Sequence, residues 1–169
     1  MPEKQTIERA QQDKREGKSP STQAGEFVRE EIHHVREGKH GARSTKQAIA
    51  IGLSKARRSG VKLGTPKKGT ASARTRKQAQ RDQQRGQSTQ KRRPSARRSR
   101  ATSGALKREG RAAASSKNLA RQARTAAKRR GSSSRHEAAM KAVKTKGQAG
   151  LKKAAQKAAR TRARHQKAA

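Results

Sequence analysis

Histidines and carboxylates near the N-terminus are the residues whose types and spacing are compatible with metal or acid–base chemistry. His33, His34 and His40 are the clustered histidines. Glu30 lies four residues before His34, and Glu37 lies three residues after it, so one helical face would hold a carboxylate–imidazole metal site. An ion pair on a solvated helix face explains the same spacing. We therefore predict no metal, no cofactor and no catalytic residue.

Other catalytic signatures are missing from the sequence. Because the chain has no cysteine, it has neither a thiol nucleophile nor a Cys-based zinc site. There is no GxxxxGK[ST] loop, and Gly38–Gly41 lacks the strand that precedes such a loop. No paired carboxylates lie in surroundings apolar enough to shift a pKa. The sequence predicts a protein that is not an enzyme.

Lysine and arginine dominate the chain. Of 169 residues, 47 are Lys or Arg and 11 are Asp or Glu, which gives a net charge of +36. Residues 1–37 have a net charge of −1, so the other 132 residues carry +37. Such a charge favours a polyanionic partner, and nucleic acid is the commonest one. Since no set of base-reading side chains is evident, we predict sequence-tolerant binding to phosphates.

The phosphate-binding residues are predicted in the basic C-terminal two-thirds of the chain. There the basic side chains surround the predicted helices instead of forming one clean stripe. Phe27 is the one aromatic residue, whereas single strands and RNA modules require stacking aromatics, so duplex DNA is favoured and structured RNA stays open. The predicted nucleic-acid-binding residues are Lys91, Arg92, Arg93, Arg97, Arg98, Arg100, Arg121, Arg124, Lys128, Arg129, Arg130, Lys152, Lys153, Arg160, Arg162 and Arg164.

The elements that would position these residues begin with a helical module over residues 5–63. Apolar residues at helical spacing predict helices over 22–37 and 45–59, and a weaker helix over 6–16. Ser44 and Gln47 match a capping box, in which each side chain satisfies a backbone donor of the other. The short connection predicts an antiparallel hairpin. A helix–turn–helix DNA reader, with 45–59 as its recognition helix, is the alternative.

Beyond this module the sequence predicts little stable structure. Residues 64–102 contain Gly, Pro and polar residues and no large apolar residue before Leu106, which predicts a disordered basic linker. Residues 103–166 predict a basic tail with short helices over about 117–130, 135–146 and 150–165. The predicted fold class is all-α, with a small N-terminal helical hairpin followed by a largely disordered tail. Because the hairpin is small, we expect marginal folding or a homodimer through residues 22–59.

Two segments of the sequence resemble known proteins. Residues 19–31 (SPSTQAGEFVREE) and 36–58 (REGKHGARSTKQAIAIGLSKARR) resemble small basic proteobacterial proteins of a domain family of unknown function, some of which are labelled plasmid stabilisation protein. The tail resembles bacterial linker-histone-like proteins. The resemblance implies a bacterial cytoplasmic setting and a plasmid or nucleoid role, and it transfers no functional residue.

These observations favour a DNA-binding accessory protein that is cytoplasmic and nucleoid-associated. Its tail would bind duplex DNA, while its helical module would mediate self-association or bind a partner protein. No membrane partner is expected. Two alternatives remain: a protein that binds structured RNA or the ribosome, and a hydrophilic stress protein with no fixed partner.

Overall fold

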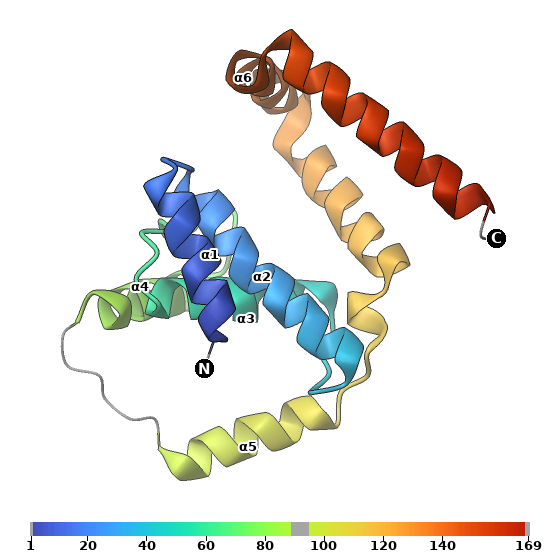
Figure 1. The fold of residues 1–169 in the computed structure, drawn as a ribbon. Helices are drawn as coiled ribbons and strands as arrows, with labels where there is room; N and C mark the ends of the chain where they lie inside the picture. Colours follow the sequence, from blue (N-terminus) through green and yellow to red (C-terminus); the bar gives the residue numbers. More distant parts are fainter. Residues whose placement is uncertain (1, 89–94, 168–169) are drawn as a thin grey trace. The chain divides into compact units, whose positions relative to one another are not determined.

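The computed structural model describes residues 2–88 and 95–167, and this part of the chain is helical (Figure 1). The all-α prediction is confirmed. The chain forms two compact units, Met1–Gln122 and Ala123–Ala169. No helix among the described residues is long and apolar enough to cross a membrane. The elements are α1 (Lys4–Arg15), α2 (Pro20–Glu37), α3 (Thr45–Arg58), α4 (Ala73–Gln87), α5 (Ala96–Lys107), the 3-10 helix η1 (Ala112–Ala114) and α6 (Ser116–Lys167).

Short polar residues and glycine set the ends of α2 and α3. The Oγ of Ser19 accepts a hydrogen bond from the Thr22 amide at 3.4 Å, and Pro20 occupies the first helical position, so α2 begins slightly earlier than predicted. Gly38 ends α2 in the left-handed conformation. Ser44 caps α3 as predicted, with its Oγ 3.2 Å from the Gln47 amide nitrogen. The Gln47 side chain, however, reaches back to the amide of Arg43.

A close contact between backbones joins α2 to α3. A Cβ placed on Gly52 of α3 would lie 2.7 Å from the Cα of Val28 on α2, closer than side chains tolerate. Glycine at this position therefore lets the two helices approach each other. Figure 1 shows α1 alongside α2, with α3 passing behind both. Helix α4 packs against α3, and η1 packs against α2 and α3.

Two small clusters of buried apolar side chains fill this unit. One contains Phe27, which is 1% exposed, together with residues of α1, α3 and the segment after α3. The other joins Ile32 and Val35 of α2 to Ala113 and Ala114 of η1. The buried alanines of η1 lie 65 or more residues away from their α3 partner Ala48 in the sequence. Residues beyond the predicted module therefore complete its core.

The segment that leads into η1 is bonded to the α2–α3 connection through backbone and side-chain hydrogen bonds. The amides of Gly41 and Ala42 donate to the carbonyls of Leu106 and Gly110 at 2.9 and 3.1 Å. The Thr45 hydroxyl donates to the Ala113 carbonyl at 2.6 Å. A side chain at Gly41 would overlap the backbone of residue 109, so this approach also requires glycine. The segment from residue 106 to 114 is thus part of the first unit.

The prediction that residues 64–102 form a disordered linker and that the tail is largely disordered is wrong. Helices α4, α5 and α6 occupy most of these residues. Ser72 caps α4 by accepting a hydrogen bond from the Thr75 amide at 3.2 Å. The prediction counted large apolar side chains, whereas α4 docks through small residues and hydrogen bonds, and Ala, Lys, Arg and Gln have high helix propensity. Low apolar content therefore did not prevent folding.

The second unit consists of the greater part of α6. Gly131 and Gly147 adopt non-helical conformations with φ of 75° and 63°, so α6 divides into helical segments over 116–130, 132–146 and 148–167. These segments overlap the three short helices that the sequence predicts. Met140 and Val143 of the middle segment are 56% and 41% exposed. A chain this rich in alanine has few larger side chains with which to cover them.

Candidate nucleic-acid interface and a buried carboxylate–histidine cluster

Helix α4 has a row of four basic side chains on its solvent-facing side. Arg74, Lys77, Arg81 and Arg85 lie at helical offsets of 0, 3, 7 and 11, which places them on one face, and all four are exposed. Among the described residues, none of the four forms an ion pair with a carboxylate. We call this row the α4 stripe. Its charges are therefore available to an external anion.

The opposite face of α4 holds the helix against α3. Ala79 and Asp82 are 4% and 2% exposed. The Ser54 hydroxyl donates to Asp82 Oδ2 at 2.6 Å, and the Arg58 guanidinium lies 3.8 Å from Oδ1. A Cβ on Gly86 would overlap the carbonyl of Arg57, so the C-terminal end of α4 also touches α3. These contacts fix the rotation of α4 and direct its stripe to solvent.

Two segments of α6 repeat this arrangement. In segment 116–130, four exposed basic residues occupy offsets 0, 4, 7 and 11, while Leu119 and Ala126 are half-buried on the opposite face. In segment 148–167, four more have the same offsets, opposite Leu151 and Ala155. Each position of the first stripe recurs 36 residues later in the second. The two α6 stripes are Lys117, Arg121, Arg124 and Lys128, and Lys153, Lys157, Arg160 and Arg164.

The spacing of charges in such a stripe allows it to bind the phosphate backbone of a nucleic acid. Successive members are separated by about 4.5–6 Å along the helix axis, because each residue rises about 1.5 Å. Four cations in a row on one side therefore extend over about 16 Å. The lysine ammonium acts as a point charge, and the arginine guanidinium can donate two parallel hydrogen bonds to one phosphate. Both side chains neutralise the negative charge of the phosphate oxygens. The arrangement binds backbones and carries no base-reading chemistry.

The predicted nucleic-acid-binding residues fall into three groups. Lys91, Arg92 and Arg93 lie outside the described residues. Arg97, Arg98 and Arg100 are exposed on α5 without forming a stripe. Of the ten predicted residues on α6, six belong to its stripes and four lie on other sides of the helix; the four are Arg129, Arg130, Lys152 and Arg162.

Sequence reasoning missed six stripe residues and misjudged the pattern. The α4 stripe was overlooked because its segment was predicted to be disordered. Basic residues do lie on several sides of the first and last α6 segments, as Arg130 and Arg162 opposite the stripes show, but the sequence-based prediction overlooked that four of them in each segment form one row. The offsets of 0, 4, 7 and 11 are visible in the sequence, and a count of helical spacing among the basic residues would have found them. The residues missed are Arg74, Lys77, Arg81, Arg85, Lys117 and Lys157.

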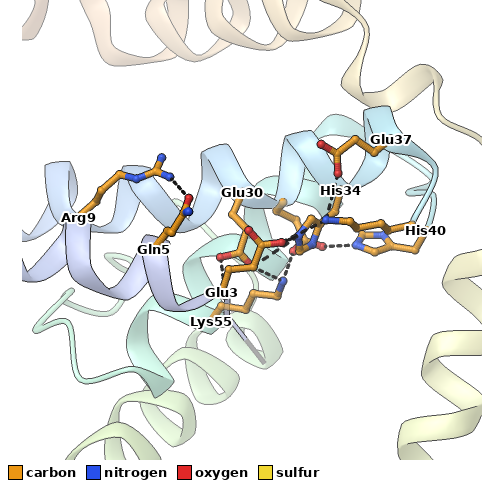
Figure 2. Close-up of polar contacts among 10 residues, drawn as sticks. Glu3, Gln5, Arg9, Glu30, His34, Glu37, His40 and Lys55 are labelled. Atoms are coloured by element: carbon orange, nitrogen blue, oxygen red, sulfur yellow. Dashed lines mark hydrogen bonds and ion pairs between the residues drawn. The ribbon is translucent and has the colours of Figure 1, made fainter.

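A second group of polar residues lies buried between α2 and α3 (Figure 2). The side chains of Glu30 and Glu31 are 2% and 1% exposed. The Lys55 ammonium lies 3.2 Å from Glu30 Oε1 and 2.7 Å from Glu31 Oε2. His40 Nε2 lies 3.1 Å from Glu31 Oε1. The predicted spacing of Glu30 and His34 brings their side chains to 4.0 Å, whereas Glu37 pairs with Lys39 instead.

The N-terminus closes the solvent side of this cluster. His34 Nε2 lies 2.9 Å from Glu3 Oε1, and the Glu3 amide donates to Glu30 Oε2 at 3.2 Å. The hydrogen bonds from His34 and Lys39 hold the pKa of the Glu3 carboxyl below its usual value. A hollow of about 320 Å³, lined by His33, His34 and Glu30 among others, opens beside these residues. Glu30 and His34 therefore border the hollow, whereas Glu31, His40 and Lys55 are not among its lining residues.

Residues 14–69 match the model of a family of unknown function, DUF6496. The match covers α2, α3 and the connection between them, with part of α1. It includes the carboxylate–histidine cluster apart from Glu3, and it ends before α4 and the three stripes begin. Neither a curated protein nor a solved structure matches the chain.

Proposed function

We propose that this chain is a sequence-tolerant duplex DNA-binding protein whose basic stripes bind the phosphate backbone. The observation that supports the proposal is the recurrence of one pattern, four exposed cations along one helix face, on α4 and twice on α6. On α4 the opposite face packs against α3. On the two α6 segments the face opposite the stripe holds Leu119 or Leu151, together with one arginine, Arg130 or Arg162.

The expected strength follows from counterion release. A stripe that neutralises four phosphates lowers the logarithm of the binding constant by about 3.6 for each tenfold rise in salt. With all three stripes engaged the slope reaches about −11.

Duplex DNA is favoured over single strands because the described part of the chain presents no exposed aromatic side chain for base stacking. A nucleoid or plasmid setting is the finer form of the proposal and is supported by the histone-like composition of the basic tail.

Titrations of the full chain against labelled ligands test this function. The ligands are two unrelated 30-base-pair duplexes, an RNA hairpin of equal charge, and heparin, each at several salt concentrations. We expect the two duplexes to bind within about threefold of each other and more tightly than the hairpin. Tighter binding to the hairpin would favour the RNA alternative. Equal weak retention of every polyanion would contradict the proposal and favour a hydrophilic protein with no fixed partner.

The homodimer through residues 22–59 stays a prediction. In the described part of the chain, the apolar faces of α2 and α3 are covered by α1, α4 and η1. The helix–turn–helix reader also stays a prediction, and the segment from residue 106 to 114 lies on the connection between its two helices.

A further inference from the structure

The buried cluster has an unbalanced charge. Glu30 and Glu31 bring two carboxylates into the interior, and among the described residues Lys55 is the one ammonium within 4.0 Å of either. Burying an uncompensated carboxylate costs several kcal/mol, so proteins pair such a group with a cation. One further positive charge would therefore balance the two carboxylates. His34 and His40 lie beside these carboxylates, where that charge would bind.

The hydrogen bonding of His40 shows which of its ring nitrogens faces Glu31. Its Nδ1 lies 3.0 Å from the carbonyl oxygen of Gly41, which can only accept a hydrogen bond, so Nδ1 carries the proton. In the neutral ring, Nε2 then holds a lone pair, and that lone pair faces Glu31 Oε1 at 3.1 Å. This geometry places two potential ligand atoms side by side, where one metal ion can contact both. Metal-binding histidines are oriented in this way, with the second nitrogen donating to a carbonyl.

Glu31 supplies a second, independent observation. Both of its carboxylate oxygens are fully buried and have no hydrogen-bond partner of acceptable geometry, although Lys55 and His40 lie near them. One ligand atom each from Glu31, His34 and His40 lies within 4.8 Å of the others. The rings of His34 and His40 meet edge to face at 6.0 Å. Three potential ligands therefore converge on one point.

We propose that Glu31, His34 and His40 bind a divalent transition metal of the Zn²⁺ class. Ligand atoms around tetrahedral zinc lie about 3.4 Å apart for bonds of about 2.0–2.1 Å. Glu31 Oε1 and His40 Nε2 are already close to this separation, and the His34 ring closes the rest by turning from Glu3. Lys55 contacts the other oxygen, Oε2, and stays in place. Two imidazoles favour Zn²⁺, Co²⁺ or Ni²⁺ over Ca²⁺ and Mg²⁺.

Metal titrations of the full chain test the site. Zn²⁺ binding is followed by calorimetry, and Co²⁺ binding by its visible absorption. We expect one equivalent of metal to bind to the parent chain. His34→Gln and His40→Gln should each lower the metal affinity by more than about 100-fold, because loss of a residue that only supports a ligand already costs about 10–100-fold. His33→Gln is the matched control, because His33 is the exposed neighbour of His34 and belongs to no ligand group. It should bind metal as the parent chain does.

Several outcomes would overturn the site. They are the absence of Zn²⁺ and Co²⁺ binding, equal loss in His33→Gln, and a preference for Mg²⁺ or Ca²⁺. Circular dichroism of each variant establishes that it is folded, and a variant that unfolds is replaced by the conservative Glu31→Gln. Spectroscopic coordination of Co²⁺ by folded His40→Gln would also contradict the assignment.

Discussion

At the residue scale, the buried pair of adjacent carboxylates is the most unusual feature. Glu30 and Glu31 precede Ile32 on α2, and all three are buried. From the sequence, Glu30 was considered for its spacing to His34, and burial was predicted for neither Glu30 nor Glu31. Their burial depends on Lys55, which lies 25 residues from Glu30 and arrives only when α3 packs on α2. A pattern of local spacing does not contain that contact.

Replacing Lys55 should therefore destabilise the fold strongly. Lys55→Met leaves two carboxylates buried without their ammonium, and removal of one partner of a buried pair costs about 3–5 kcal/mol. Lys46→Met on the same helix is the control, because Lys46 is exposed and should change stability by less than about 0.5 kcal/mol. Urea unfolding followed by circular dichroism measures both. Equal midpoints would show that Lys55 does not stabilise the pair.

At the element scale, small residues replace large apolar ones as the means of packing. Gly52 allows α3 onto α2, Gly86 allows α4 onto α3, and Gly41 allows the segment before η1 onto the α2–α3 connection. The sequence predicted the two central helices closely, because apolar spacing, a Ser44 cap and Gly38 are all local signals. It failed for α4 and η1, because glycine contacts and buried alanines leave no periodic pattern of large side chains.

The role of Gly52 gives a prediction with an internal control. In Gly52→Ala the new Cβ would lie 2.7 Å from the Val28 Cα, so overpacking of about 1–3 kcal/mol should exceed the helix-propensity gain of about 1 kcal/mol. In Gly25→Ala on α2 nothing lies within 4 Å of the new Cβ, so the propensity gain alone remains. Thermal melts should therefore show Gly52→Ala less stable and Gly25→Ala more stable than the parent chain. Stabilisation by both would contradict the close crossing.

At the scale of the whole molecule, acidic and basic residues are separated. Eight of the 11 acids lie in residues 1–37, and within the described part of the chain all of these except Glu8 form ion pairs or belong to the buried cluster. The remaining 132 residues carry a net charge of +37, and part of that charge is arranged in the three stripes. Composition alone predicted the class of partner. It did not predict the stripes, because they depend on helices that the same composition argued against.

The proposed function requires that these stripes, and not diffuse positive charge, bind the phosphates. Two variants, with substitutions in α6 segments 132–146 and 148–167, each lose four positive charges. One removes a stripe and the other removes basic residues outside any stripe. The stripe variant combines Lys153→Gln, Lys157→Gln, Arg160→Gln and Arg164→Gln. The control combines Lys141→Gln, Lys146→Gln, Lys152→Gln and Arg162→Gln.

The decisive measurement is the salt dependence of duplex DNA binding by the parent chain and these two variants. We expect the stripe variant to lower the magnitude of the salt slope by about 3–4, which corresponds to four lost phosphate contacts. The control should lower it by about 1 or less. Equal reductions in the two variants would contradict the account, because binding would then depend on the amount of positive charge and not on its arrangement.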